Sequence, residues 1–227
     1  MKKIFLSIAV TIFFAAAYGQ KISKITINRD GAFDQLSVVL DENVTVTMDN
    51  EGGIKAWGIE IYSERIPTMS KLDPYPGRVE NYPSTDNEAF QGKVKYIGRT
   101  LITYYGSYDN EAFRGKVKSI GSSVLEYYSS YDNDLLKGKL KSVGPVAFNW
   151  YTSYDNEALR GKLKSIGSTA LNYYTSFDDK AIRGKVKSID RAQFTYYQST
   201  ERKDYEGMVK TGTQLQTING ILFHVRF

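Results

Sequence analysis

The chain contains no cysteine and a single histidine, His224, among its 227 residues. Without cysteine it can form no disulfide and cannot carry the acylated cysteine of a bacterial lipoprotein anchor. A zinc site of the usual His and Cys ligands cannot be assembled, and no local motif supports a Ser-His-Asp triad. The acids recur in every repeat, whereas an active site is normally built once. We therefore expect a non-enzymatic protein with no metal and no cofactor.

Long apolar runs are equally scarce. The exception is residues 4–17, which follow Lys2 and Lys3 and lead to small residues near Gly19 and Gln20. This layout is typical of a secretory signal peptide, and the run is short for a membrane span. We expect residues 1–19 to be removed. The mature protein would then be exported to the periplasm, the cell surface or the medium, with no membrane span.

An excess of one charge is also missing. The formal net charge of +5 falls to +3 in residues 20–227, because residues 1–19 contain two lysines and no acid. Basic and acidic residues are interspersed, which is typical of a solvated surface and not of a dedicated nucleic-acid binder. Nucleic acid is therefore not an expected partner.

Repetition is what the chain has in abundance. Five aspartates are spaced 23 residues apart, at Asp86, Asp109, Asp132, Asp155 and Asp178. Such a fixed period indicates a repeat architecture with atypical ends. Five copies occupy residues 86–200, and residues 201–227 hold a degenerate repeat and a C-terminal capping strand. Residues 20–85 are a β-rich N-terminal cap, either continuous with the sheet of the repeats or a small subdomain.

Within one copy, residues 161–166 and 170–177 alternate as two strands joined by a turn. A three-residue turn would place one set of side chains on a core face, namely Leu163, Leu171, Tyr173 and Phe177. The opposite face would then carry Lys162, Lys164, Asn172, Tyr174 and Ser176, with Ile166 and Ala170 near the turn.

The link between copies, residues 155–161, has the composition of one helical turn. Asp155 could cap this turn, Glu157 and Arg160 would lie three residues apart on it, and Gly161 would end it. Leu159 would then lie against the core face. The Asp-Asn-Glu segment also offers hard oxygen ligands of the kind that calcium prefers, but caps and Asx turns explain it with fewer assumptions.

Because an isolated hairpin is not stable, neighbouring copies must stack. The sequence therefore predicts an all-β fold, an elongated tandem array of β-hairpins in a meander or solenoid-like sheet. The alternative is a parallel β-helix with one copy per coil. That arrangement would bring equivalent lysines to about 4.8 Å, the spacing of neighbouring strands, whereas hairpins double the distance to roughly 9.6 Å. Charge repulsion thus favours the hairpin array.

Tyrosine is unusually frequent, with 18 residues, and many of these residues fall in the repeats. A first column, Tyr104, Tyr127, Trp150, Tyr173 and Tyr196, would face the core. A second column, here called the inner tyrosine ladder, consists of Tyr105, Tyr128, Tyr151, Tyr174 and Tyr197. A tyrosine ring is a rigid apolar plate with a polar tip, which suits stacking on sugar rings. The neighbouring lysines Lys95, Lys118, Lys141, Lys164 and Lys187 could act as rim donors. Alternatively, tyrosines and lysine stems simply cover a sheet face.

The pattern Tyr-Tyr-x-x-x-Asp-Asn-x-x-apolar-x-Gly-Lys runs from Tyr104 to Lys116 and again from Tyr127 to Lys139. It resembles the repeats of bacterial choline-binding and glucan-binding proteins, and this resemblance implies cell-wall or polysaccharide ligands. The copies are also similar to a family of secreted bacterial repeat proteins with Gly-Lys-x-Lys-Ser-Ile-Gly units, a likeness that implies no activity. We expect a binding or scaffolding module with a polysaccharide as the leading partner. The second hypothesis is a structural or protein-interaction protein of the cell envelope.

Overall fold

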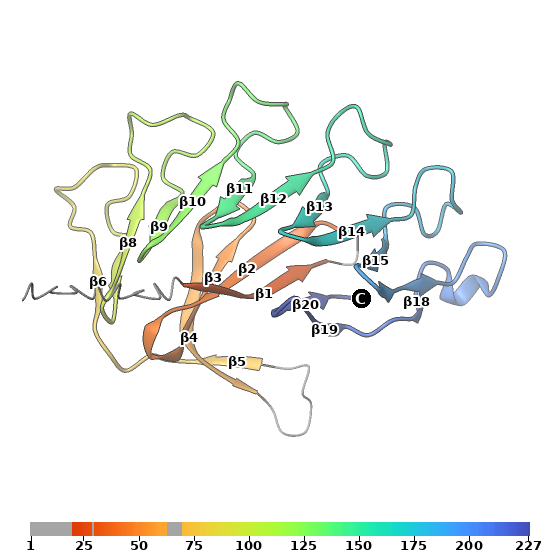
Figure 1. Cartoon of the computed structure of the whole chain (residues 1–227), viewed down its shortest axis with the longest axis horizontal. Helices are drawn as coiled ribbons and strands as arrows, with labels where there is room; N and C mark the ends of the chain where they lie inside the picture. The colour runs from red at the N-terminus through yellow and green to blue at the C-terminus, as the bar shows by residue number, and fades with distance from the viewer. Residues whose placement is uncertain (1–19, 29, 63–69) are drawn as a thin grey trace, which may run out of the picture.

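A computed structural model describes residues 20–28, 30–62 and 70–227. The expected signal peptide, residues 1–19, lies outside the described residues. The fold is all-β and contains two large sheets that share one hydrophobic core. Figure 1 shows the repeats as a fan of hairpins that arches over the strands of the other sheet, with a row of loops along its outer edge.

The repeats form an eleven-stranded antiparallel meander. In sequence order its strands are β6 (Val79–Asn81), β7 (Val94–Ile97), β8 (Thr100–Tyr104), β9 (Val117–Ile120), β10 (Ser123–Tyr127), β11 (Leu140–Val143), β12 (Val146–Trp150), β13 (Leu163–Ile166), β14 (Thr169–Tyr173), β15 (Val186–Ile189) and β16 (Ala192–Gln193). A short pair, β17 (Thr195–Tyr196) and β18 (Val209–Thr211), continues the pattern into the degenerate repeat. Each strand pairs with the next in antiparallel register, so the hairpin array is confirmed and the parallel β-helix is wrong.

The second sheet unites the two ends of the described chain. Its strands, in the order in which they pair, are β19 (Leu215–Ile218), β20 (Ile221–Val225), β1 (Lys21–Ile27), β2 (Phe33–Val39), β3 (Val44–Asp49), β4 (Ile54–Tyr62) and β5 (Ser70–Asp73). All neighbours are antiparallel except β1 and β20, which pair in parallel. Two single 3-10 turns, Asp41–Asn43 and Lys203–Tyr205, complete the elements.

The two sheets contact one another through turns and aromatic rings. The Phe33 ring meets the Trp150 ring edge-on, with centroids 5.7 Å apart. Gly52 has a φ of +83°, and a Cβ at this position would lie 2.7 Å from the Tyr127 hydroxyl. Glycine is therefore required there both by the backbone conformation and by the close approach of the ring. These contacts make the seven-stranded sheet a second layer that covers the array.

The hairpin turn differs from the expected three-residue loop. Ile166 pairs with Thr169, so the loop contains two residues, and its first residue, Gly167, has a φ of +54°. Positive φ at this position is typical of the tight turns that match strand twist. Ile166 is buried, contrary to its expected place near the turn on the polar face.

A β-bulge explains how the core face accommodates this shorter turn. Asn149 pairs with Ser165, but Trp150 pairs with Leu163, so Lys164 is an extra residue in its strand. The bulge resets the alternation, and Leu163 and Ile166 both point into the core although they are three positions apart in the strand. Equivalent register shifts occur at the corresponding lysine of the other repeats.

The link between repeats is not a helical turn as expected, but a series of tight turns. The amide of Leu159 donates to the carbonyl of Asn156, and the amide of Lys162 donates to the carbonyl of Leu159. Each bond spans three residues and none continues into a helix. Leu159 is buried, as expected.

Candidate functional site

The inner tyrosine ladder lies at the end of each hairpin, directly after the second strand. Each ring of Tyr105, Tyr128, Tyr151 and Tyr174 is partly buried against the core. The Tyr105 hydroxyl donates to the carbonyl of Leu125 at 2.9 Å, and the Tyr174 hydroxyl donates to the carbonyl of Phe194 at 3.0 Å. Each bond reaches the next repeat, twenty residues along the chain, so the ladder fastens neighbouring hairpins together.

The predicted lysines do meet the predicted tyrosines. The ammonium of Lys118 lies 5.3 Å from the centre of the Tyr105 ring, and that of Lys164 lies 5.3 Å from the Tyr151 ring. The same contact joins Lys141 to Tyr128 and Lys187 to Tyr174. At the two ends of the array the partner is a residue that was not predicted, because Lys95 lies over Tyr82 and Lys210 lies over Tyr197. These separations are within the range of cation–π attraction. Each lysine therefore covers a tyrosine of the preceding repeat.

Rings of the inner tyrosine ladder also contact aromatic rings of the next repeat. Tyr105 meets Tyr127 edge-on at 6.0 Å, and Tyr151 and Tyr174 have the same relation to the buried rings of the repeat that follows. Burial, with a smaller contribution from Glu126 and Asp109, raises the pKa of the Tyr105 phenol. The ring faces of the inner tyrosine ladder are therefore already covered by lysines and neighbouring rings, which leaves little surface for a sugar to stack on. This geometry favours the structural role. Its glycan-binding role remains a prediction.

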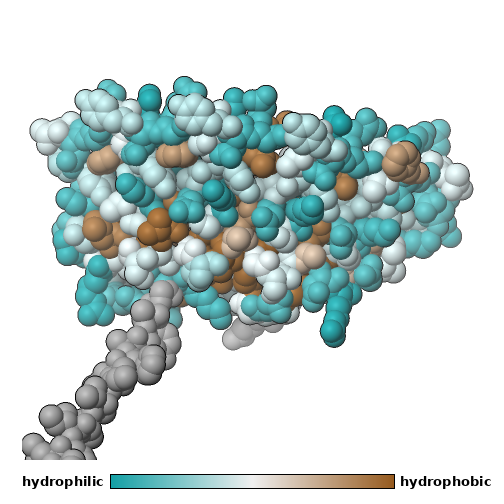
Figure 2. Space-filling view, turned by 45° about the horizontal axis from the view of Figure 1, so that its top comes forward, coloured by the Kyte–Doolittle hydropathy of each residue, from teal (hydrophilic) through white to brown (hydrophobic). Residues whose placement is uncertain are grey.

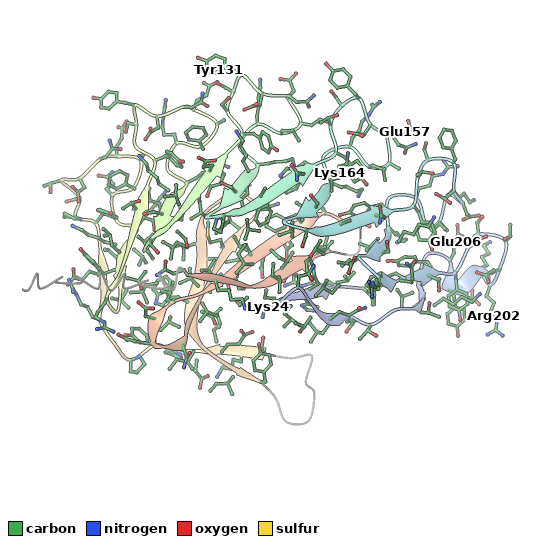
Figure 3. All side chains as sticks on the ribbon, viewed as in Figure 1. Lys24, Tyr131, Glu157, Lys164, Arg202 and Glu206 are labelled. Atoms are coloured by element: carbon green, nitrogen blue, oxygen red, sulfur yellow. The ribbon has the colours of Figure 1, made fainter. Side chains whose placement is uncertain are left out.

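Another aromatic column is fully exposed. It comprises Tyr108, Tyr131, Tyr154 and Phe177, which occupy the same position in four consecutive repeats; we call it the exposed row. Their exposed fractions are 100% for Tyr108 and 93% for the other three. In the described chain these side chains make no hydrogen bond and no ring contact. Figure 3 shows Tyr131 projecting outward from the loop edge.

The placement of Phe177 corrects the sequence interpretation, which put this residue on the core face. The alternation of the strand was extended four residues too far, because β14 ends at Tyr173. The signal that could have located the row is the turn chemistry on either side of it. The aromatic residue stands between Ser and Asp-Asn or Asp-Asp, a composition typical of exposed turns.

The loops that carry the exposed row are held by their own side chains. The carboxylate of Asp155 accepts bonds from the amide and hydroxyl of Thr152, at 2.6 and 2.8 Å. These bonds hold the pKa of Asp155 below its ordinary value. Because the Asp155 carboxylate already accepts hydrogen bonds from Thr152, the arrangement favours a structural role for the aspartates of the loops over a calcium site.

Neighbouring loops are also joined to one another. The side-chain oxygen of Asn156 accepts from the amide of Ser176 at 3.0 Å, and its Nδ2 donates to the Ser176 hydroxyl at 2.8 Å. Asn110, Asn133 and Asp179 make corresponding contacts. The loops that carry the exposed row are therefore hydrogen-bonded to one another along the array.

The surroundings of the exposed row are polar. Each loop carries charged residues beside its ring, such as Glu157 and Arg160 in the loop of Tyr154. The face shown in Figure 2 is mostly hydrophilic, with separated apolar patches rather than one continuous apolar surface. The row thus combines isolated ring plates with nearby hydrogen-bonding groups.

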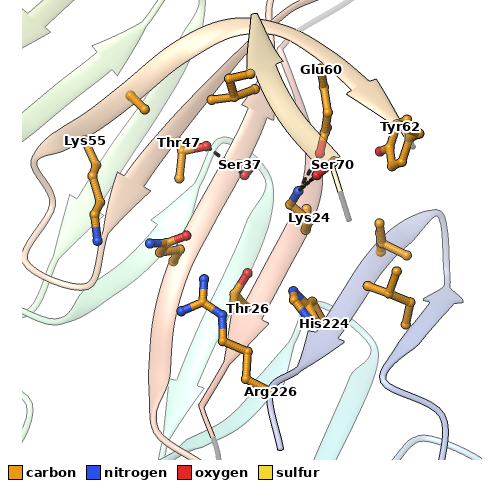
Figure 4. Close-up of a pocket in the computed structure, with 15 residues that line it drawn as sticks. Lys24, Thr26, Ser37, Thr47, Lys55, Glu60, Tyr62, Ser70, His224 and Arg226 are labelled. Atoms are coloured by element: carbon orange, nitrogen blue, oxygen red, sulfur yellow. Dashed lines mark hydrogen bonds and ion pairs between the residues drawn. The ribbon is translucent and has the colours of Figure 1, made fainter. Parts of the chain in front are cut away.

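A second candidate is a cavity of about 400 Å³ on the seven-stranded sheet (Figure 4). It lies on the sheet's polar face, and of its 15 lining residues only Ala56, Leu72, Leu215 and Leu222 are apolar. His224, the single histidine of the chain, contributes to this wall. Burial, followed by the charges of Arg226 and Lys24, lowers the pKa of His224 from its ordinary value.

The described residues contain neither a metal-binding cluster nor a membrane-spanning helix. Within residues 20–28, 30–62 and 70–227, no three His, Cys, Asp or Glu side chains are grouped so as to hold a metal ion. In the same part of the chain, no helix has the length and apolar character needed to cross a membrane.

Comparison with known proteins adds no identity. No protein-family model, no curated protein and no solved structure matches the chain. The resemblance to choline-binding and glucan-binding repeats therefore remains a prediction from the sequence. What the structure defines is an all-β hairpin-repeat protein.

Proposed function

We propose that the chain is an exported, non-enzymatic binding or scaffolding protein and that its leading ligand is a polysaccharide held along the exposed row. The observation that carries the proposal is the row itself. Four aromatic rings stand almost fully in solvent at one position of the repeat, and packing gives no reason for them. This proposal moves the ligand from the inner tyrosine ladder to the loop edge.

The chemistry of the row suits a glycan. Aromatic plates stack on the apolar faces of sugar rings, while charged and amide groups beside them can bond to sugar hydroxyls. A linear polymer repeats its unit along its length, as the array repeats its rings. Since the loops are fastened by Asn156 and its equivalents, little conformational freedom would be lost on binding, which favours affinity.

The alternative is a structural or protein-interaction role without a glycan. The locked inner tyrosine ladder supports it, because these residues are fully explained by joining one hairpin to the next. A protein partner could also use the exposed row, since tyrosine is frequent at protein interfaces. The two proposals differ in whether a purified polysaccharide alone is bound.

Co-sedimentation of residues 20–227 with insoluble cellulose, chitin and peptidoglycan tests the proposal. The row variant carries Tyr108→Ser, Tyr131→Ser, Tyr154→Ser and Phe177→Ser, and it should remain folded because these side chains support no contact. The control variant carries Tyr128→Phe, Tyr151→Phe and Tyr174→Phe, which leave the exposed row intact.

We expect saturable binding of the wild-type chain to at least one polysaccharide, loss of binding in the row variant and retention in the control. Circular dichroism checks that each variant is folded. A wild-type chain that stays in the supernatant with all three would refute the glycan proposal and direct the search to protein partners. Loss only in a variant of the inner ladder would return the site to the originally predicted tyrosines.

A further inference from the structure

The polar cavity of the seven-stranded sheet has features of a small-molecule site that is separate from the exposed row. Its volume of about 400 Å³ falls within the usual range for ligand pockets. Its walls come from both ends of the described chain, because β20 inserts between β19 and β1. Curling of the sheet turns its polar face inward, so side chains that would otherwise point into open solvent converge (Figure 4).

A fixed ion pair lies at one side of the cavity. The ammonium of Lys24 donates to Glu60 at 2.5 Å and to the Ser70 hydroxyl at 3.2 Å. The side chains of Lys24 and Glu60 are only 18% and 10% exposed. Burial alone would raise the pKa of Glu60, but the hydrogen bonds from Lys24 and Ser70 outweigh it and lower the pKa. Glu60 is therefore neutralised by Lys24 and does not compensate the other cations of the cavity.

Two further cations line the same cavity. Lys55 forms no hydrogen bond or ion pair with any described residue. Arg226 donates one Nη to Asp34 at 2.8 Å, and a guanidinium has further donors that this single bond does not use. A carboxylate is the natural partner for such donors, because bonds between two charged groups are stronger than neutral ones.

Neutral hydroxyl and amide groups complete the lining. Thr26, Gln35, Ser37 and Thr47 lie on three adjacent strands, and the Ser37 and Thr47 hydroxyls share a hydrogen bond at 3.2 Å. Thr26 and Ser37 are buried at the base of the cavity, whereas Gln35 and Thr47 are partly exposed. Groups of this kind both donate and accept, so they match a ligand with several hydroxyls. The cavity therefore combines cations for one negative group with partners for hydroxyl groups.

We propose that this cavity binds a polyhydroxylated carboxylate, that is, a sugar acid of the size of a single uronic acid. Its carboxylate would lie between Lys55 and Arg226, and its hydroxyls would face the partly exposed Gln35 of β2 and Thr47 of β3. The site does not depend on the exposed row, so either proposal can fail without the other.

His224 provides a direct reporter, because it is the single histidine of the chain. Its imidazole carbon-bound protons can be followed by nuclear magnetic resonance in the intact protein, residues 20–227, without assigning other residues. The charged groups around it are Lys24 on β1, Arg226 directly after the end of β20 and Glu60 on β4, whereas the neighbouring β19 carries none. The probes are D-galacturonate, D-galactose and inorganic phosphate.

We expect D-galacturonate to shift the His224 signals in a saturable way and to bind at least tenfold more tightly than D-galactose or phosphate. A bound carboxylate should also raise the pKa of His224. Lys55→Gln should weaken galacturonate binding about tenfold, the loss of one charge-assisted bond. Lys71→Gln, an exposed lysine of β5 outside the cavity, should leave the affinity unchanged.

Three results would overturn the proposal. The first is no saturable shift with galacturonate in the folded protein. The second is equal binding of galactose or phosphate, which would remove the need for the carboxylate or for the hydroxyl partners. The third is an equal loss in Lys55→Gln and Lys71→Gln, which would indicate a general charge effect.

Discussion

The phenol hydroxyl of Tyr173 donates a hydrogen bond of 2.8 Å to the backbone carbonyl of Leu163, ten residues earlier in the same repeat. Tyr127 makes the same bond to Val117 at 2.9 Å. In the third repeat the indole nitrogen of Trp150 donates to the carbonyl of Leu140 at 2.7 Å. In these three repeats the column therefore places a ring with a donor at its far end beside a backbone carbonyl, which explains why tryptophan can replace tyrosine at Trp150.

Removal of this donor should destabilise the array. In Tyr173→Phe a buried carbonyl loses its partner, and we expect the free energy of unfolding to fall by about 1–2 kcal/mol. The Tyr196 hydroxyl provides a matched control, because it is buried without a hydrogen-bond partner among the described residues. Tyr196→Phe should therefore be neutral or slightly stabilising. Urea denaturation measures both, and equal losses in the two variants would contradict the role assigned to the bond.

The fifth hairpin turn contains a non-glycine residue in a backbone conformation that favours glycine. Asp190 has a φ of +49° at the position where Gly167 has +54°. A residue with a Cβ is disfavoured there, so Asp190→Gly should stabilise the protein by about 1 kcal/mol. The reverse change, Gly167→Asp, should lower stability by a similar amount because of the positive φ. Steric contact should add little, since a Cβ at Gly167 would meet only Val146, at 3.6 Å. Thermal unfolding compares the two, and a destabilising Asp190→Gly would contradict the assignment.

Stability should depend on pH through His224. Its pKa in the folded protein lies below the ordinary value of 6.5, chiefly because of burial. The unfolded chain then binds the proton more readily, so protonation opposes folding. As the pH falls from about 6.5 through the folded pKa, stability should decrease. His224→Gln should remove this part of the pH dependence, and an unchanged profile in that variant would assign the effect to other groups.

The local pattern of the sequence was sufficient to predict the hairpin array and part of its core. The alternation of Leu163, Leu171 and Tyr173 placed these residues correctly, and all three are buried. The same reasoning failed at Ile166 and Phe177. At Ile166 it assumed an uninterrupted ladder, whereas the bulge at Lys164 shifts the alternation by one residue. At Phe177 it extended the strand beyond its end at Tyr173.

Non-local pairing was beyond the reach of local patterns. The strands before residue 62 could be recognised as β from their composition, but β1 pairs with β20, which lies about 200 residues further along the chain. Nothing in a 23-residue period specifies this parallel pairing or the cavity that it helps to form. For the same reason, the sequence identified Lys118 and Tyr105 as candidates but not that one covers the other.

Affinity measurements on single-ring variants test the central claim most directly. Tyr108→Ser, Tyr131→Ser, Tyr154→Ser and Phe177→Ser would each be titrated against the polysaccharide that sediments the wild-type protein. If the row is the binding platform, each ring removed should lower the affinity about two- to tenfold, the range expected for one ring contact of about 0.5–1.5 kcal/mol. The losses should accumulate in the row variant. Wild-type affinity in all four variants and in the row variant would contradict the claim.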